Sequence, residues 1–154
     1  MARLSSRPFP PYQFLPGKTL HPEKEGGYLY GHKLSFQKLK DDFLQNEDFC
    51  YSLDLMEANF FWEAHVYLEG LWNQVRKEKE KSDQAIFLQS LILLNAAGVK
   101  FLLQSFEAAQ AHRQRALELI SSVSHVPNFN LQKITKWMED YDFKRPASFP
   151  LGPH

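Results

Sequence analysis

The stretch that decides the fold is FWEAHVYLEGLW, residues 61–72. Apolar residues recur in it every three or four positions, the spacing typical of an amphipathic α-helix. At 100° per residue, His65, Glu69 and Trp72 fall in one narrow sector. Apolar residues flank this sector, and a carboxylate and an imidazole are costly on such a face unless they are paired. We therefore expect a buried polar pair at this point, which serves either as a functional site or as a clamp in the core.

Helical periodicity continues on both sides of this stretch. Asn59 tolerates left-handed geometry and is expected to break the chain, and Ser82 or Asp83 is expected to cap the next long helix. No strand alternation of useful length and no internal repeat is found. The sequence therefore predicts an all-α fold, a compact bundle of about five to six helices. The expected helices are residues 34–45, 49–57, 60–75, 84–104, 106–124 and 131–140.

Segments rich in proline and glycine lie at both ends. Residues 7–31 interleave them with large aromatic side chains, which excludes a helix or a central strand. Because these aromatic side chains need burial, an extended arm across the body is expected rather than a proline-rich ligand for another domain. We expect one domain, residues 1–154, with an arm (1–33), a helical bundle (34–141) and an extended tail (142–154).

Composition narrows the class of function. The 154 residues are 44% hydrophobic and 14% aromatic, enough for one domain with one core. Lys and Arg balance Asp and Glu at 18 each, and residues 76–81 alternate in charge, so no nucleic-acid partner is expected. Residues 1–11 lack the apolar stretch of a signal peptide, and the interrupted apolar run 86–103 is expected to be a core helix rather than a membrane span. The chain has a single cysteine, Cys50, so an internal disulfide is excluded, which fits a cytoplasmic protein. We expect the Cys50 side chain to be buried as a small apolar group.

A second histidine is predicted to face the same interior. His112 projects from the centre of the apolar face of residues 106–124, and Asn95 lies within the apolar face of the preceding helix. If these helices pack together, His65, Glu69 and His112 could meet. Two imidazoles and a carboxylate would suit zinc or iron, or a general acid and base. Metal spacings such as His-Glu-x-x-His are absent, which favours a satisfied internal hydrogen-bond network.

Glu63 is predicted to lie apart from this cluster. It falls on the opposite side of its helix from His65, together with Tyr67 and Gly70. We expect it at the surface or at a rim. No nucleophile motif and no glycine-rich phosphate loop occurs in the chain.

The order of several motifs resembles the domain-of-unknown-function 309 family. Residues 10–12 (PPY), 16–17 (PG) and 21–22 (HP) resemble the arm of that family, and 62–65 (WEAH) with Glu69 and Trp72 resembles its central motif. Residues 87–92 and 96–100, and His112 with 115–116, resemble its next two helices, so the resemblance covers about residues 7–120. It implies a small helical bundle with no settled reaction. It marks five further positions: His21, Glu63, Trp72, Gln89 and Lys100.

The chain departs from the family pattern at three positions. Val66 stands where the family usually has a glutamate after the histidine, Ser90 replaces a glycine, and Leu93 replaces a glutamine. If a glutamate at position 66 were a catalytic acid or a ligand, this chain would lack it.

Two hypotheses for the function follow. The first is a non-catalytic binding or assembly module that self-associates through its arms and aromatic surface. The second is a metal-assisted or acid–base enzyme, similar to a hydrolase, acting on a small substrate at His65, Glu69 and His112 with zinc or iron. Whether the chain is an enzyme stays open at this point.

Overall fold

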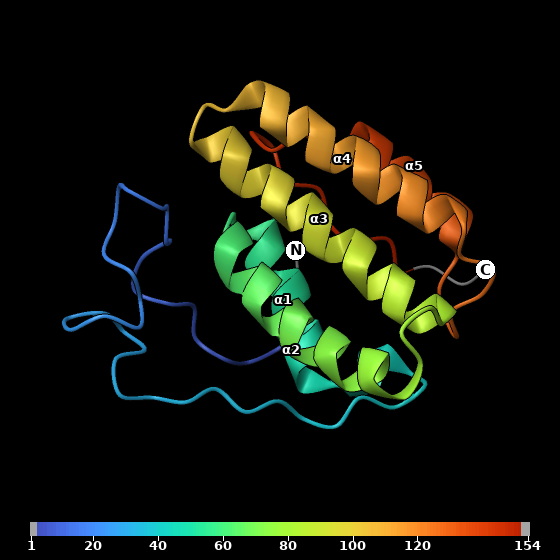
Figure 1. Cartoon of the computed structure of the whole chain (residues 1–154), viewed down its shortest axis with the longest axis horizontal. Helices are drawn as coiled ribbons and strands as arrows, with labels where there is room; N and C mark the ends of the chain where they lie inside the picture. Colours follow the sequence, from blue (N-terminus) through green and yellow to red (C-terminus); the bar gives the residue numbers. More distant parts are fainter. Residues whose placement is uncertain (1–2, 152–154) are drawn as a thin grey trace.

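The computed structural model describes residues 3–151 and is all-helical, with no strand in that range. Consecutive helices pack against one another, and α3 lies between α2 and α4 at the centre of the bundle (Figure 1). A short 3-10 turn, η1 (Phe43–Gln45), precedes the first helix. The helices are α1 (Glu47–Glu57), α2 (Phe61–Lys79), α3 (Asp83–Leu102), α4 (Phe106–Ser121) and α5 (Leu131–Asp140).

Short polar side chains set the helix boundaries. The side chain of Ser82 accepts a hydrogen bond from the backbone of Ala85 and caps α3, as predicted. Asn46 and Asn130 cap α1 and α5 in the same way. Asn59 has a φ of 68° and ends the α1–α2 connection, which confirms the predicted break.

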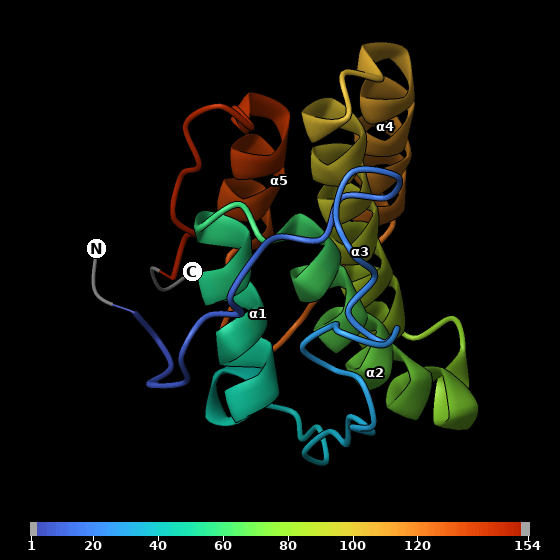
Figure 2. The ribbon, with the colours of Figure 1, turned by 90° about the vertical axis from the view of Figure 1, so that its left-hand side faces the viewer.

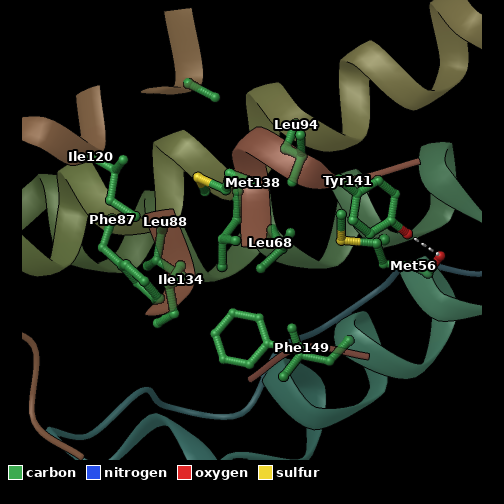
Figure 3. Packing of buried hydrophobic residues seen from close by; sticks show 14 of the residues in the cluster. Met56, Leu68, Phe87, Leu88, Leu94, Ile120, Ile134, Met138, Tyr141 and Phe149 are labelled. Atoms are coloured by element: carbon green, nitrogen blue, oxygen red, sulfur yellow. Dashed lines mark hydrogen bonds between the residues drawn. The ribbon is translucent and has the colours of Figure 1, made fainter. Parts of the chain in front are cut away.

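The core combines aliphatic side chains with aromatic rings that come from helices and loops. Phe87 of α3 stacks on Phe129 from the loop before α5, with ring centroids 5.3 Å apart. The C-terminal tail closes the other side, where Phe149 is buried and the Tyr141 hydroxyl donates a hydrogen bond to the carbonyl of Met56 (3.4 Å; Figure 3). The segment that follows α5 is therefore part of the core.

Residues 34–45 do not form the predicted helix. Only Phe43–Gln45 turns, as η1, and the preceding residues run without helical structure. Side chains of the bundle take up the backbone donors of this segment: Asp48 accepts from the Gln37 N–H, and Gln74 accepts from the Leu39 N–H at 2.9 Å. Helical periodicity was present in the sequence, but these tertiary hydrogen bonds outweigh it.

The N-terminal arm, residues 3–33, runs along α1 and then crosses to the beginning of α2 (Figure 2). Its start is held by α1, where the Asp54 carboxylate accepts the Leu4 and Ser5 N–H groups, each at 2.9 Å. Arg7 pairs with Asp48 at 2.7 Å. The arm is thus attached to the helices rather than extended into solvent.

Helix α3 is long and apolar enough to cross a membrane by length and composition alone. More than half of this stretch is buried inside the bundle, between α2 and α4. Such burial is typical of a core helix.

Gly98 allows α2 and α3 to approach closely. A Cβ at this position would lie 2.4 Å from the Phe61 ring. We expect Gly98→Ala to lower the free energy of unfolding by about 1–2 kcal/mol, because overpacking costs more than the gain in helix propensity. Urea unfolding followed by circular dichroism measures this change. In a Phe61→Leu background the loss should largely disappear, and an equal loss in both backgrounds would contradict the contact.

Candidate functional site

His65 and Glu69 do pair, but not in the core. The His65 Nε2 lies 3.1 Å from a Glu69 carboxylate oxygen, and the two side chains are 28% and 49% exposed. The expectation of a buried pair is wrong. The face of α2 that is buried in the core is formed instead by Phe61, Ala64, Leu68 and Leu71, and His65 and Glu69 lie beside it.

The predicted three-residue centre does not form. His112 is partly exposed on α4, and no three His, Cys, Asp or Glu side chains within residues 3–151 converge as a metal ligand set. Asn95 is fully buried, where its amide donates to the Leu91 carbonyl at 2.9 Å and contacts the Met56 sulfur at 3.4 Å. Neither a zinc or iron centre nor a sealed network joins His65, Glu69 and His112.

The buried carboxylate of α2 is Glu63 instead. Its exposed fraction is only 3%, so its predicted position at a surface or rim is wrong. One oxygen, Oε2, accepts the Phe14 N–H at 2.8 Å and the Tyr28 hydroxyl at 2.9 Å. The other oxygen, Oε1, is buried and has no hydrogen-bond partner among the described residues. Both donors come from the N-terminal arm, which covers this flank of the helix.

Glu63 lines a cavity of about 190 Å³ between the arm and helices α1 and α2. An apolar cavity of about 150 Å³ is enough to hold benzene, so this one has room for a small organic molecule. Four of the residues that line it are aromatic. The lining residues are Pro8, Pro10, Tyr28, Leu29, Leu34, Tyr51, Trp62, Glu63, Val66 and Tyr67.

Aromatic contacts hold the arm over α2. Phe14 is buried and meets the Trp62 ring edge-on, with centroids 4.8 Å apart. The His21 ring packs against both, at 4.8 Å from Phe14 and 5.5 Å from Trp62. Its Nδ1 accepts the Glu23 N–H at 3.1 Å, so this family-motif histidine acts as a packing residue of the arm.

A tight turn brings Tyr28 to Glu63. The Leu29 N–H donates to the Pro22 carbonyl at 2.8 Å, which folds residues 22–29 back on themselves. Gly27 lies inside this turn, where a Cβ would come within 2.3 Å of the Pro22 carbonyl oxygen. Glycine is therefore required at position 27, and the turn is the local reason that the Tyr28 hydroxyl reaches the carboxylate.

Burial is the largest cause of the pKa shifts of the titratable residues that line the cavity. It raises the pKa of Glu63, and three donors only partly oppose this shift: the Phe14 N–H, the backbone N–H of Glu63 itself in the first turn of α2, and the Tyr28 hydroxyl. Burial and the charge of Glu63 raise the pKa of Tyr28 strongly, so its hydroxyl stays a donor. Burial also raises the pKa of Tyr67, and that of Tyr51 to about 12. The aromatic walls are therefore neutral at physiological pH.

The Arg7 side chain at the edge of this region is already engaged in ion pairs. The Arg7 guanidinium lies 5.3 Å from the Tyr51 ring centroid and 6.0 Å from that of Tyr67. It is paired with Asp48 at 2.7 Å and approaches Glu47 at 3.7 Å. Arg7 thus balances other carboxylates than that of Glu63.

The remaining singled-out residues lie outside the cavity. The Arg76 guanidinium stacks over the Trp72 ring at 4.7 Å, and Gln89 and Lys100 are partly buried on α3. Cys50 is buried and its thiol contacts the Leu44 carbonyl at 3.3 Å. Its position confirms the predicted small buried residue, and burial raises the pKa of its thiol, which disfavours the thiolate.

Sequence reasoning missed Glu63 and also Arg113. One guanidinium nitrogen of Arg113 donates to the carbonyls of Met138, Glu139 and Tyr141 at 3.0, 3.3 and 2.7 Å, which caps the end of α5. For Glu63 a signal was present, because it shares its flank of α2 with Tyr67 and Gly70, and the aromatic arm needed a surface to cover.

Comparisons of the chain with protein-family models, with curated proteins and with solved structures find no match.

His65→Ala should change stability only slightly. Exposed ion pairs four residues apart on a helix contribute about 0.3–0.5 kcal/mol, so the free energy of unfolding should fall by less than about 1 kcal/mol. Urea unfolding of His65→Ala and Glu69→Ala measures this. A loss of about 3–5 kcal/mol, the value for a broken buried pair, would contradict the exposed position.

Glu63→Gln should stabilise the protein, and the more so as pH rises. Because the pKa of Glu63 in the folded state is raised above its usual value of 4.5, the folded state binds the proton more tightly than the unfolded one. The wild type therefore loses stability as pH rises from 4.5 through the raised pKa, whereas the amide does not titrate. Melting temperatures of both proteins between pH 4.5 and 8 measure the difference. A difference independent of pH would show that Glu63 does not titrate in this window.

Proposed function

We propose that the protein is a non-catalytic binding module that holds a small organic molecule in the cavity beneath its N-terminal arm. The observation that carries this proposal is the buried Glu63 oxygen without a partner, placed on a residue that lines an aromatic cavity.

An unpaired buried acceptor is unfavourable for a folded protein. Leaving such a group unsatisfied costs about 1–3 kcal/mol, and more for a charged group. A ligand that donates a hydrogen bond to Oε1 would remove this cost. Binding sites commonly combine an apolar or aromatic lining with a few polar groups that fix the orientation of the ligand, and this cavity has that composition.

The lining favours binding over catalysis. Acid–base chemistry usually needs a second group whose pKa lies near neutrality. Glu63 is the one carboxylate among the described lining residues, which include no His, Cys, Ser or Lys. The only other titratable groups there are tyrosines whose pKa values are raised. His65 and Glu69, the residues of the enzyme hypothesis, do not line the cavity.

We also propose membership of the domain-of-unknown-function 309 family, on the motifs quoted above. One of the three positions that depart from its pattern, Val66, lines the cavity together with Glu63. A glutamate there would put a second carboxylate in the same space. Its replacement by valine supports a site in this chain that binds rather than reacts. Self-association and a cytoplasmic location remain separate predictions from the sequence.

Filling the cavity tests the proposal. We expect a fragment screen by nitrogen-15 NMR to find ligands that shift the Trp62 indole resonance at millimolar concentration. Val66→Phe, which places a ring in the cavity, should weaken these ligands at least about 10-fold, a change of about 1.4 kcal/mol. Val75→Phe is the matched control, because Val75 is on the same helix but lines a different groove.

Two results would contradict this function. One is a screen in which no fragment shifts the Trp62 indole. The other is binding that Val66→Phe and Val75→Phe leave equally intact, with both variants folded by circular dichroism.

A further inference from the structure

We propose that the ligand of this cavity is a small organic ammonium ion, a protonated primary or secondary amine on an apolar body. This inference rests on the proposed function and names the chemical class that the Glu63 cavity would take. Its basis is the combination of a buried carboxylate oxygen free to accept and a wall of aromatic rings.

The carboxylate supplies the charge. Oε2 of Glu63 is already bound by the Phe14 N–H and the Tyr28 hydroxyl, whereas Oε1 has no partner in the described structure. A neutral donor would satisfy the hydrogen-bonding need of Oε1. An ammonium N–H would do so and also neutralise the charge, which gives a stronger, charge-assisted hydrogen bond. A group that is 97% buried gains most from such neutralisation, because a buried charge without a counter-charge is costly.

The aromatic side chains that line the cavity also favour a cation. Tyr28, Tyr51, Tyr67 and Trp62 all line the cavity. Aromatic faces attract ammonium groups by about 0.5–2 kcal/mol, and more as water is excluded. Pro8, Pro10, Leu29, Leu34 and Val66 form the apolar remainder, which would contact the hydrocarbon body of the ligand.

Other ligand classes fit less well. An anion would face the Glu63 carboxylate, and the nearby Arg7 is engaged by Asp48 at 2.7 Å. A hard metal ion such as calcium needs six to eight oxygen ligands. The described lining offers a single carboxylate, with neutral tyrosine hydroxyls beside it. The cavity volume of about 190 Å³ limits the ligand to roughly one ring with a short substituent.

Binding of this class should depend on pH in a defined direction. The other titratable groups that line the cavity are Tyr28 from the arm, Tyr51 from α1 and Tyr67 from α2, and the Arg7 guanidinium lies near the Tyr51 ring. The three tyrosines are neutral and Arg7 stays charged across the neutral range, so Glu63 sets the dependence. Because the ammonium ion needs the ionised carboxylate, affinity should rise with pH through the raised pKa of Glu63 and then level off.

Matched probes of one shape and different charge test the proposal. The probes are benzylammonium, benzyl alcohol and benzoate, titrated into the full chain by calorimetry and by the Trp62 indole resonance at pH 5 and pH 8. We expect benzylammonium to bind at least about 10-fold more tightly than either other probe at pH 8. Its advantage should shrink at pH 5. Glu63→Gln should lower its affinity at least about 10-fold and change that of benzyl alcohol by less than about threefold.

The outcomes separate this inference from the proposed function. Equal or tighter binding of benzyl alcohol, with little effect of Glu63→Gln, would overturn the ammonium class and leave a binding cavity in place. Tighter binding of benzoate would overturn it as well. Binding of none of the probes, while the fragment screen finds neutral ligands blocked by Val66→Phe, would also overturn the ammonium class alone.

Discussion

Carboxylates on α1 and α2 fasten the N-terminal arm to the bundle, and the candidate site depends on this attachment. An extended segment has no internal ladder, so its backbone N–H groups need acceptors elsewhere. Asp54 accepts those of Leu4 and Ser5, and Glu63 accepts that of Phe14. Asp48 accepts that of Gln37, beyond the arm. All three carboxylates are at most 5% exposed. Without them the arm would lose these backbone hydrogen bonds to α1 and α2, and mainly its aromatic contacts, such as that of Phe14 with Trp62, would hold it over the cavity.

The three carboxylates differ in how their charge is balanced. Arg7 pairs with Asp48 at 2.7 Å, and Arg3 lies 3.4 Å from Asp54. No cationic side chain pairs with Glu63 in the described structure, and its partners are a backbone amide and a phenol. Asp48 and Asp54 are thus explained by their structural role. Glu63 has no cationic partner among the described residues and keeps a buried oxygen without a hydrogen bond, the kind of local inconsistency that marks functional sites.

The sequence predictions that depended on local pattern were mostly confirmed, whereas those that depended on tertiary packing were often wrong. The approximate spans of α2, α3 and α5, the break at Asn59 and the Ser82 cap follow from spacing and from single-residue geometry, and all are found, although α2 continues to Lys79. Residues 34–45 had the period of a helix, but hydrogen bonds from Asp48 and Gln74 hold their backbone instead. Such long-range partners are not visible in a local pattern.

The error at the candidate site has a similar origin. Periodicity correctly made α2 amphipathic, but it could not say which flank of the helix another segment would cover. His65 and Glu69 lie beside the buried stripe and remain partly exposed. On the other flank, α1 and the arm bury Glu63 and Tyr67 to different extents. The aromatic content of the arm predicted that it needed a surface, although the surface itself depends on the path of some thirty residues without regular structure.

The Glu63 carboxylate belongs both to the cavity and to the attachment of the arm that covers it. Oε2 holds the arm through Phe14 and Tyr28, and Oε1 is the atom left for a ligand. A cation at Oε1 would keep the carboxylate ionised, and an ionised carboxylate is the stronger acceptor for the Phe14 N–H and the Tyr28 hydroxyl. A bound ammonium ion would therefore strengthen the attachment of the arm rather than compete with it. By reciprocity, whatever tightens the arm over Glu63 favours the ligand. The arm is then a cover whose closure and the occupancy of the cavity stabilise each other.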